Sequence, residues 1–127
     1  MKQEDKELLL KDLCARLPYN VKVGRQNCFN PNKVEVENIS EIISHCSYED
    51  LVGLIDNLHL KPYLRPMSSM TEEEKEEYSK LCFEISYNAE TEKWGTILFD
   101  WLNANHFDYR HFIEKGLAIE SPVGMYK

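Results

Sequence analysis

The N-terminal segment has the apolar spacing of an amphipathic helix. Apolar side chains recur at intervals of three and four residues, which places them on one helical face, at Leu10, Leu13, Cys14 and Leu17. Acidic residues lie near the start of the segment and Arg16 lies near its end, as the helix dipole favours. We therefore predict a helix over residues 4–17, ended by Pro18, with Cys14 packed in the core.

Two short runs of alternating valines predict β-strands. Val21 and Val23 alternate with polar residues, and Val34 and Val36 do the same further along the chain. Residues 27–32 between the runs are rich in turn-forming residues, so we expect an antiparallel pair. Because two strands alone are marginally stable, the pair needs a third strand or a covering helix.

The central part of the chain predicts one helix followed by an extended connector. Ser47 and Asp50 offer a cap, and the apolar residues that follow have helical spacing, which favours a helix over residues 48–57. Residues 58–69 contain Pro62 and Pro66, and each proline disfavours a helical conformation in the residue before it. We expect this stretch to cross the surface in extended form.

Thr71 and Glu74 form a capping box, which is the clearest boundary in the sequence. The helix that it begins should run to Leu81 or Cys82, with Tyr78, Leu81 and Cys82 facing inward. Apolar and polar residues then alternate over residues 83–87, which predicts a strand, although Ile85 also continues the helical face of Tyr78.

The C-terminal third predicts two helices and a docked tail. A wide apolar face indicates a helix over residues 95–104, with the inward residues Trp94, Ile97, Leu98, Trp101 and Leu102. Asp108 is placed to cap a last short helix that carries Tyr109, Phe112 and Ile113 and stops at Gly116. Leu117 and Ile119 then alternate with polar or small residues, as in a tail that packs against a sheet.

Together these elements predict an α+β fold in one globular domain over residues 1–127. We expect a small antiparallel β-sheet of three or so strands, packed by an N-terminal helix and C-terminal helices. The length and the 43% share of apolar residues suit a single core. No apolar run reaches the ~18 residues of a membrane span, and the acidic start does not resemble a signal peptide. We therefore expect a cytoplasmic protein with no membrane association and with reduced cysteines.

The net charge of −7 disfavours nucleic acid as a partner, because nonspecific binding depends on basic side chains. No segment of the chain is basic. Residues 95–115 nevertheless predict a helix, a tight turn and a second helix, the arrangement of a DNA-reading motif. A nucleic-acid-associated protein that uses this C-terminal helix pair is therefore our alternative hypothesis.

The residue patterns give weak support for an enzyme or a metal site. His106, Asp108 and His111 offer ligand atoms for a metal, but their spacing fixes no common helical face. The five glycines stand singly, so phosphate-binding and dinucleotide-binding signatures are missing and we expect no cofactor. A small metal-dependent enzyme is a second alternative, and Asp108 is better explained as a helix cap.

Two segments resemble a known family. LKPYLRPMSSMTEEE at residues 60–74 and DWLNANHFDYRHFIEKGLAIESP at residues 100–122 are similar to segments of a family of short, uncharacterised proteins. Genomes of gut anaerobic bacteria encode this family, often in prophages and other mobile elements. The resemblance implies a bacterial or phage cytoplasmic setting and a small accessory protein, and it supplies no catalytic residue.

We therefore expect a non-catalytic interaction or accessory protein that presents an aromatic and acidic surface to a protein partner. Aromatic residues and arginine are enriched at interface hot spots. On that basis the candidate interaction surface consists of Tyr63, Leu64, Arg65, His106, Phe107, Tyr109 and Arg110. The sequence does not identify the partner, and it leaves homo-oligomerisation open.

Overall fold

Helices and short strands alternate along the chain, and the fold is α+β as predicted. The computed structural model describes residues 2–26, 34–43, 53, 55, 60–87 and 90–126. Its elements are α1 (Gln3–Arg16), η1 (Leu17–Tyr19), β1 (Lys22–Gln26), β2 (Val34–Asn38), α2 (Ile39–Ile43), β3 (Lys61–Leu64), η2 (Met67–Ser69), α4 (Glu72–Tyr87), α5 (Thr91–Ala104) and β4 (Ile119–Glu120). The predicted turn at 27–32 and most of the predicted helix at 48–57 lie outside the described residues.

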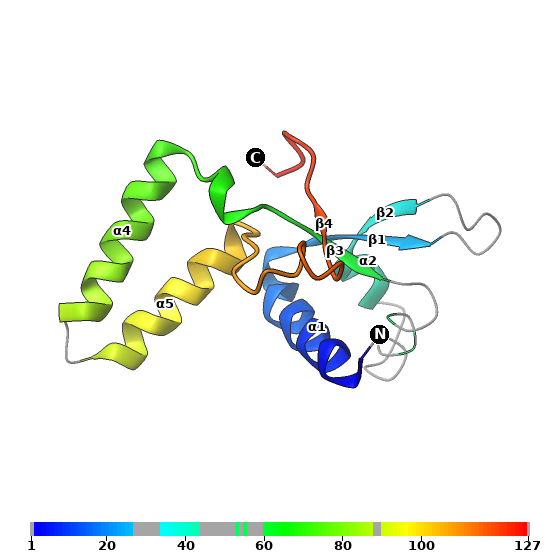
Figure 1. Ribbon diagram of the computed structural model, residues 1–127, viewed down its shortest axis with the longest axis horizontal. Helices are drawn as coiled ribbons and strands as arrows, with labels where there is room; N and C mark the ends of the chain where they lie inside the picture. Colours follow the sequence, from blue (N-terminus) through cyan, green and yellow to red (C-terminus); the bar gives the residue numbers. More distant parts are fainter. Residues whose placement is uncertain are drawn as a thin grey trace.

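The strands form one sheet in the order β2-β1-β3-β4. β1 pairs with β2 in antiparallel register, with Gly24 opposite Val36, which confirms the predicted valine-rich pair. β3 is also antiparallel to β1, whereas β4 runs parallel to β3, with Ile119 opposite Tyr63. The sheet is therefore mixed, because the chain returns to it through the long excursion that contains α4 and α5 (Figure 1).

The stretch predicted as an extended surface connector is the interior strand β3. Pro62 lies within it, opposite Val23. On the other side of β3, β4 pairs only with Tyr63 and Leu64. Among the described strands, Pro62 therefore has no paired residue on the β4 side. A missing backbone N–H costs no ladder hydrogen bond there, which explains how proline is tolerated in an interior strand.

The core lies between α1 and the sheet (Figure 1). It includes Leu9, Leu13, Val21, Val23, Ile39, Leu60, Leu64 and Phe112. The buried face of α1 differs from the predicted one, since Asp12 and Arg16 are buried and Cys14 is exposed. The prediction that Cys14 packs in the core is therefore wrong, because α1 turns its acid–base pair inward.

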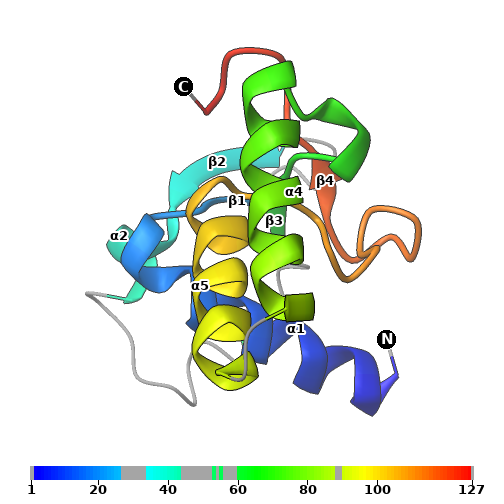
Figure 2. The same cartoon turned by 90° about the vertical axis from the view of Figure 1, so that its left-hand side faces the viewer.

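α4 and α5 lie side by side as a helical hairpin to one side of the sheet (Figures 1 and 2). The capping box is confirmed, since the Glu74 carboxylate accepts from Thr71 N and the Thr71 hydroxyl accepts from Glu74 N. α4 continues to Tyr87, so the strand predicted at 83–87 is wrong. Stacking of Tyr78 on Trp101, with ring centroids 6.2 Å apart, joins the two helices.

The predicted last helix is not formed, since residues 109–110 and 112–116 are turns and residue 111 has no regular structure. Gly116 has φ +74°, a conformation that suits glycine. The tail does pack against the sheet as predicted, through β4. Among the described helices, none combines the length and the apolar character that crossing a membrane requires.

Candidate functional site

The structure brings the two halves of the predicted interaction surface together inside the protein. Leu64 and Phe107 have no exposed surface, and Tyr63 and His106 are 8% exposed. Only Arg65, Tyr109 and Arg110 of the seven residues are partly exposed. Four of the seven residues of the candidate interaction surface are therefore buried, because their side chains help to close the core, and the other three keep partial exposure.

A short parallel bridge explains this burial. Arg65 N donates to His106 O over 2.7 Å, and Asp108 N donates to Arg65 O over 2.8 Å. The Arg65 guanidinium lies over the Phe107 ring, 4.3 Å from its centroid. The segments that follow β3 and α5 are thereby fixed to each other, and their aromatic side chains serve packing.

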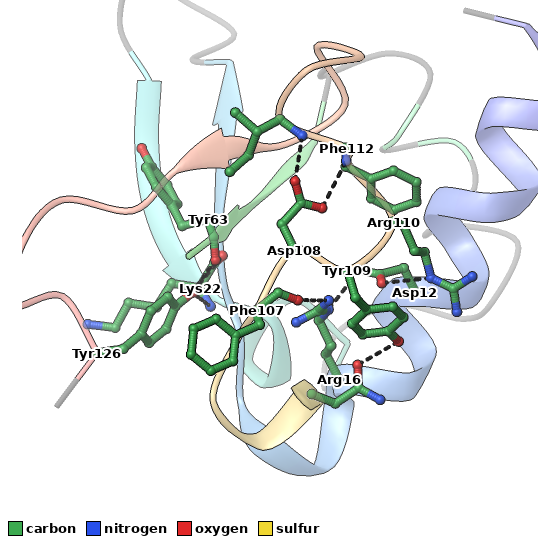
Figure 3. A network of polar contacts seen from close by, with 12 residues as sticks. Asp12, Arg16, Lys22, Tyr63, Phe107, Asp108, Tyr109, Arg110, Phe112 and Tyr126 are labelled. Carbon is green, nitrogen blue, oxygen red and sulfur yellow. Dashed lines mark hydrogen bonds and ion pairs between the residues drawn. The ribbon is translucent and has the colours of Figure 1, made fainter. Parts of the chain in front are cut away.

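A buried ionic network connects α1 to the turn after α5 (Figure 3). Arg16 Nε donates to Asp12 Oδ2 over 2.8 Å, and Arg110 Nε donates to Asp12 Oδ1 over 3.1 Å. Arg16 Nη2 also donates to Phe107 O over 2.6 Å. One carboxylate therefore serves two guanidinium groups, and the sequence analysis did not find this arrangement.

The three weak metal-ligand candidates do not converge. The Asp108 carboxylate accepts from Phe112 N over 2.8 Å and from Ile113 N over 3.0 Å, so it caps a turn (Figure 3). His106 is buried and His111 is exposed, each with a positive φ. Within the part of the chain that the structure describes, no group of three or more histidine, cysteine, aspartate or glutamate side chains is arranged to hold a metal ion.

Tyr126 fastens the C-terminal segment to the sheet. Its hydroxyl donates to Tyr63 O over 2.7 Å and accepts from Lys22 N over 2.9 Å (Figure 3). Its ring stacks on His106, with centroids 3.8 Å apart. Burial raises the pKa of Tyr126 to about 12. Burial, together with the charges of Arg16 and Arg65, lowers the pKa of His106 to about 4.

An ion pair joins the end of β3 to the start of α4. The Arg65 guanidinium donates to both carboxylate oxygens of Glu74, over 2.7 and 2.8 Å. Hydrogen bonding from Arg65 lowers the pKa of Glu74 to about 2. The same carboxylate completes the capping box, so one side chain fixes both the position and the start of α4.

Large apolar side chains are exposed on the hairpin. Phe83 is 58% exposed and Tyr87 is 76% exposed, and their rings lie 4.4 Å apart on α4. Glu72 and Glu76 precede Phe83 by about three and about two helical turns, so all four residues lie on one side of α4. We call these four residues the outer face of α4.

The hairpin also carries most of the excess negative charge. Residues 72–104 contain nine acidic and three basic side chains, while the chain has a net charge of −7. The outer face of α4 is thus aromatic and acidic, the character that we expected of an interaction surface. The sequence analysis missed its location because it assigned Phe83 and Tyr87 to a strand.

The comparisons with known proteins supply no relative. No protein-family model matches the chain, and neither a curated protein nor a solved structure matches it.

Proposed function

We propose that this chain is an interaction protein that binds a basic, amphipathic segment of a partner protein through the outer face of α4. The observation that carries the proposal is the contact pair of Phe83 and Tyr87, exposed on an acidic helix. Neighbouring exposed aromatic residues are uncommon without a binding role, and aromatic side chains contribute strongly to interface affinity.

The charge around this pair selects the partner. Glu72 and Glu76 precede the aromatic pair on the same side of α4, and the Glu72 side chain is 89% exposed although it pairs with Lys75. Lysine or arginine side chains of a partner would complement these carboxylates and increase the rate of association. A second copy of the same face is disfavoured, because it would place like charges opposite each other.

The position of α4 favours access by a partner. The helix packs against α5 through Tyr78 and stands to one side of the sheet (Figure 2), and all four residues of its outer face are exposed. Arg65 and Glu74 fix its first turn to β3. A helix that is already rigid loses little conformational entropy when it binds, which suits a docking surface.

A labelled peptide tests this proposal. The probe is an amphipathic helix of leucine and lysine, about 18 residues or five turns long, and fluorescence anisotropy measures its binding. The control peptide has the same composition in an order that disperses the leucines. We expect the amphipathic peptide to bind at least about tenfold more tightly than the control, and more weakly as salt rises.

Variants then locate the binding site. Phe83→Ala/Tyr87→Ala should weaken binding about tenfold or more. The matched control, Val34→Ala/Val36→Ala, removes two other exposed apolar side chains from β2 and should leave binding unchanged. Equal peptide affinity in the wild type and in Phe83→Ala/Tyr87→Ala would contradict the proposal. A stable wild-type dimer that dissociates in this variant would also contradict it, because the outer face of α4 would then bind a second copy of the chain.

An accessory role in bacterial or phage mobile elements is part of this proposal. It rests on the resemblance of residues 60–74 and 100–122 alone. The nucleic-acid alternative requires a second helix after Asp108, whereas the structure has turns at residues 109–110 and 112–116.

A further inference from the structure

A groove of about 580 Å³ lies between α1, α5 and the turn that follows α5. Each element contributes two lining residues, which are Lys11 and Ala15, Phe99 and Asn103, and Tyr109 and Arg110. On each helix the two residues are four apart and therefore share a face. The volume lies within the range of small-molecule sites, and α4 contributes no residue to the lining.

The groove is positively charged although the protein is acidic. Lys11 and Arg110 line it, and no acidic side chain is among its lining residues. Arg110 shares the Asp12 carboxylate with Arg16, whose buried Nη1 has no hydrogen-bond partner within the described structure. Lys11, Arg16 and Arg110 carry three positive charges, and Asp12 carries one negative charge. The net charge of these four side chains is +2, which a dianion would neutralise.

An aromatic corner adjoins these cations, since the Arg110 guanidinium lies 5.1 Å from the centroid of the Tyr109 ring. The Phe99 ring is 49% exposed and lies 5.3 Å from the Tyr109 ring, at an interplanar angle of 59°. Tyr109 is held in place, because its hydroxyl donates to Asn103 Oδ1 over 2.9 Å and the Arg16 guanidinium lies 5.2 Å from its ring centroid. A planar ring can therefore stack on Phe99 without moving Tyr109.

We infer that this groove binds a small phosphorylated compound with a planar ring, the chemistry of a nucleoside monophosphate. The phosphate lies against Lys11 and Arg110, and the fork of a guanidinium matches phosphate oxygens. The ring lies on Phe99, where stacking depends little on the identity of the base. The small side chain of Ala15 leaves the space that the ligand fills.

Binding of 5′-AMP to the full chain tests the inference by nuclear magnetic resonance titration. We expect saturable shifts in the signals of Phe99 and Tyr109. Adenosine lacks the phosphate and inorganic phosphate lacks the ring, so each should bind at least about tenfold more weakly than 5′-AMP. The absence of any shift at about 1 mM ligand would overturn the inference. Equal binding of inorganic phosphate would also overturn it, because the groove would then be a simple anion site.

Matched pairs of variants locate the site. Phe99→Ala should weaken 5′-AMP binding by about 5- to 100-fold, and Lys11→Glu by about tenfold or more. Ala15→Phe should abolish binding by filling the groove. The control changes are Phe83→Ala and Lys80→Glu, both at exposed positions of α4, and they should leave the affinity unchanged.

Circular dichroism of each variant separates loss of the site from loss of the fold. Wild-type affinity in a folded Phe99→Ala or Lys11→Glu variant would overturn the inference. The outer face of α4 lies elsewhere, so Phe83→Ala/Tyr87→Ala should lose peptide binding and keep 5′-AMP binding. Each proposal can therefore fail without the other.

Discussion

Arg16 and Asp12 form an ion pair of 2.8 Å in which neither side chain has any exposed surface. The pair occupies the inner face of α1 beside Leu9 and Leu13. Its remaining contacts reach Arg110 and the Phe107 carbonyl oxygen, so it joins α1 to the turn after α5. Removal of Arg16 leaves the buried Asp12 carboxylate with only the partly exposed Arg110 as an ionic partner, which is more costly than loss of an exposed pair.

We predict that Arg16→Met lowers the free energy of unfolding by about 3–5 kcal/mol, because Asp12 stays buried without its main partner. Urea denaturation followed by circular dichroism measures the change. The control, Lys93→Ala, breaks an exposed pair with Glu90 and should cost at most about 0.5 kcal/mol. If both variants lose a similarly small free energy of unfolding, the Arg16 ion pair does not stabilise the fold as we predict.

Protonation of His106 should destabilise the protein in mild acid. Its pKa is lowered to about 4 by burial and by the charges of Arg16 and Arg65, whereas in the unfolded chain the pKa is 6.5. Between pH 6.5 and pH 4 the unfolded state therefore binds more protons, and stability falls as the pH falls. A shift of this size is worth about 3 kcal/mol, and partial contact with solvent lowers the expected loss to about 2 kcal/mol.

Urea denaturation at a series of pH values tests this dependence. His106→Asn removes the titrating group, and asparagine tolerates the φ of +61° at this position, so the slope between pH 6.5 and pH 4 should decrease. The matched control is His111→Asn, which changes an exposed histidine with a φ of +60° and should keep the wild-type slope. If the free energy of unfolding of His106→Asn depends on pH as in the wild type, groups other than His106 cause the dependence.

The close approach of side chains over Gly24 predicts that its replacement destabilises the protein. A Cβ atom there would lie 2.9 Å from Val34 Cγ1 and 3.1 Å from Ile119 Cδ1. We expect Gly24→Ala to cost about 1–3 kcal/mol, measured by thermal denaturation. Gly95→Ala is the control, because the new Cβ meets nothing within 4 Å and should stabilise α5 by about 0.5–1 kcal/mol. A neutral Gly24→Ala would contradict the packing described for this face of the sheet.

Glu74 should stabilise the protein through its charge. Its pKa is lowered to about 2 by Arg65, so its contribution is complete above pH 4.5 and is lost as the pH falls towards 2. Glu74→Gln keeps a capping oxygen and removes the charge, and it should cost about 1–2 kcal/mol at pH 7 and almost nothing near pH 2. Denaturation at both pH values gives the comparison, with the exposed Glu73→Gln as control. If Glu74→Gln still lowers the free energy of unfolding near pH 2, the loss comes from changed hydrogen-bond geometry and the charge is not its cause.

Local signals in the sequence predicted the elements that depend on local contacts. The capping box of Thr71 and Glu74 forms as expected because both partners lie within one helical turn. The alternating valines also marked the two strands β1 and β2, which pair in antiparallel register with each valine opposite another residue type. Asp108 likewise caps a turn through its carboxylate, although the helix expected after it does not form.

Tertiary contacts decided the features that the sequence did not predict. The residues from Phe83 to Tyr87 fit either a strand or a helix by their spacing, and in the structure they continue α4. Asp12 and Arg16 have the spacing of a helical ion pair, but the spacing does not explain their burial. Contacts with Arg110 and with the Phe107 carbonyl oxygen, from a distant segment, explain it. The surface that we propose for binding lies elsewhere than the sequence suggested, since a strand at 83–87 would not place Phe83 beside Tyr87.

Photo-crosslinking from position 83 tests the central claim most directly. Phe83→p-benzoylphenylalanine places a reactive group on the outer face of α4, and Val36→p-benzoylphenylalanine is the control at another exposed position. In cells that produce the chain, we predict an adduct from position 83 that mass spectrometry maps to a basic amphipathic segment of another protein and that the leucine–lysine peptide prevents. Adducts from position 36 alone, or none from position 83, would contradict the account.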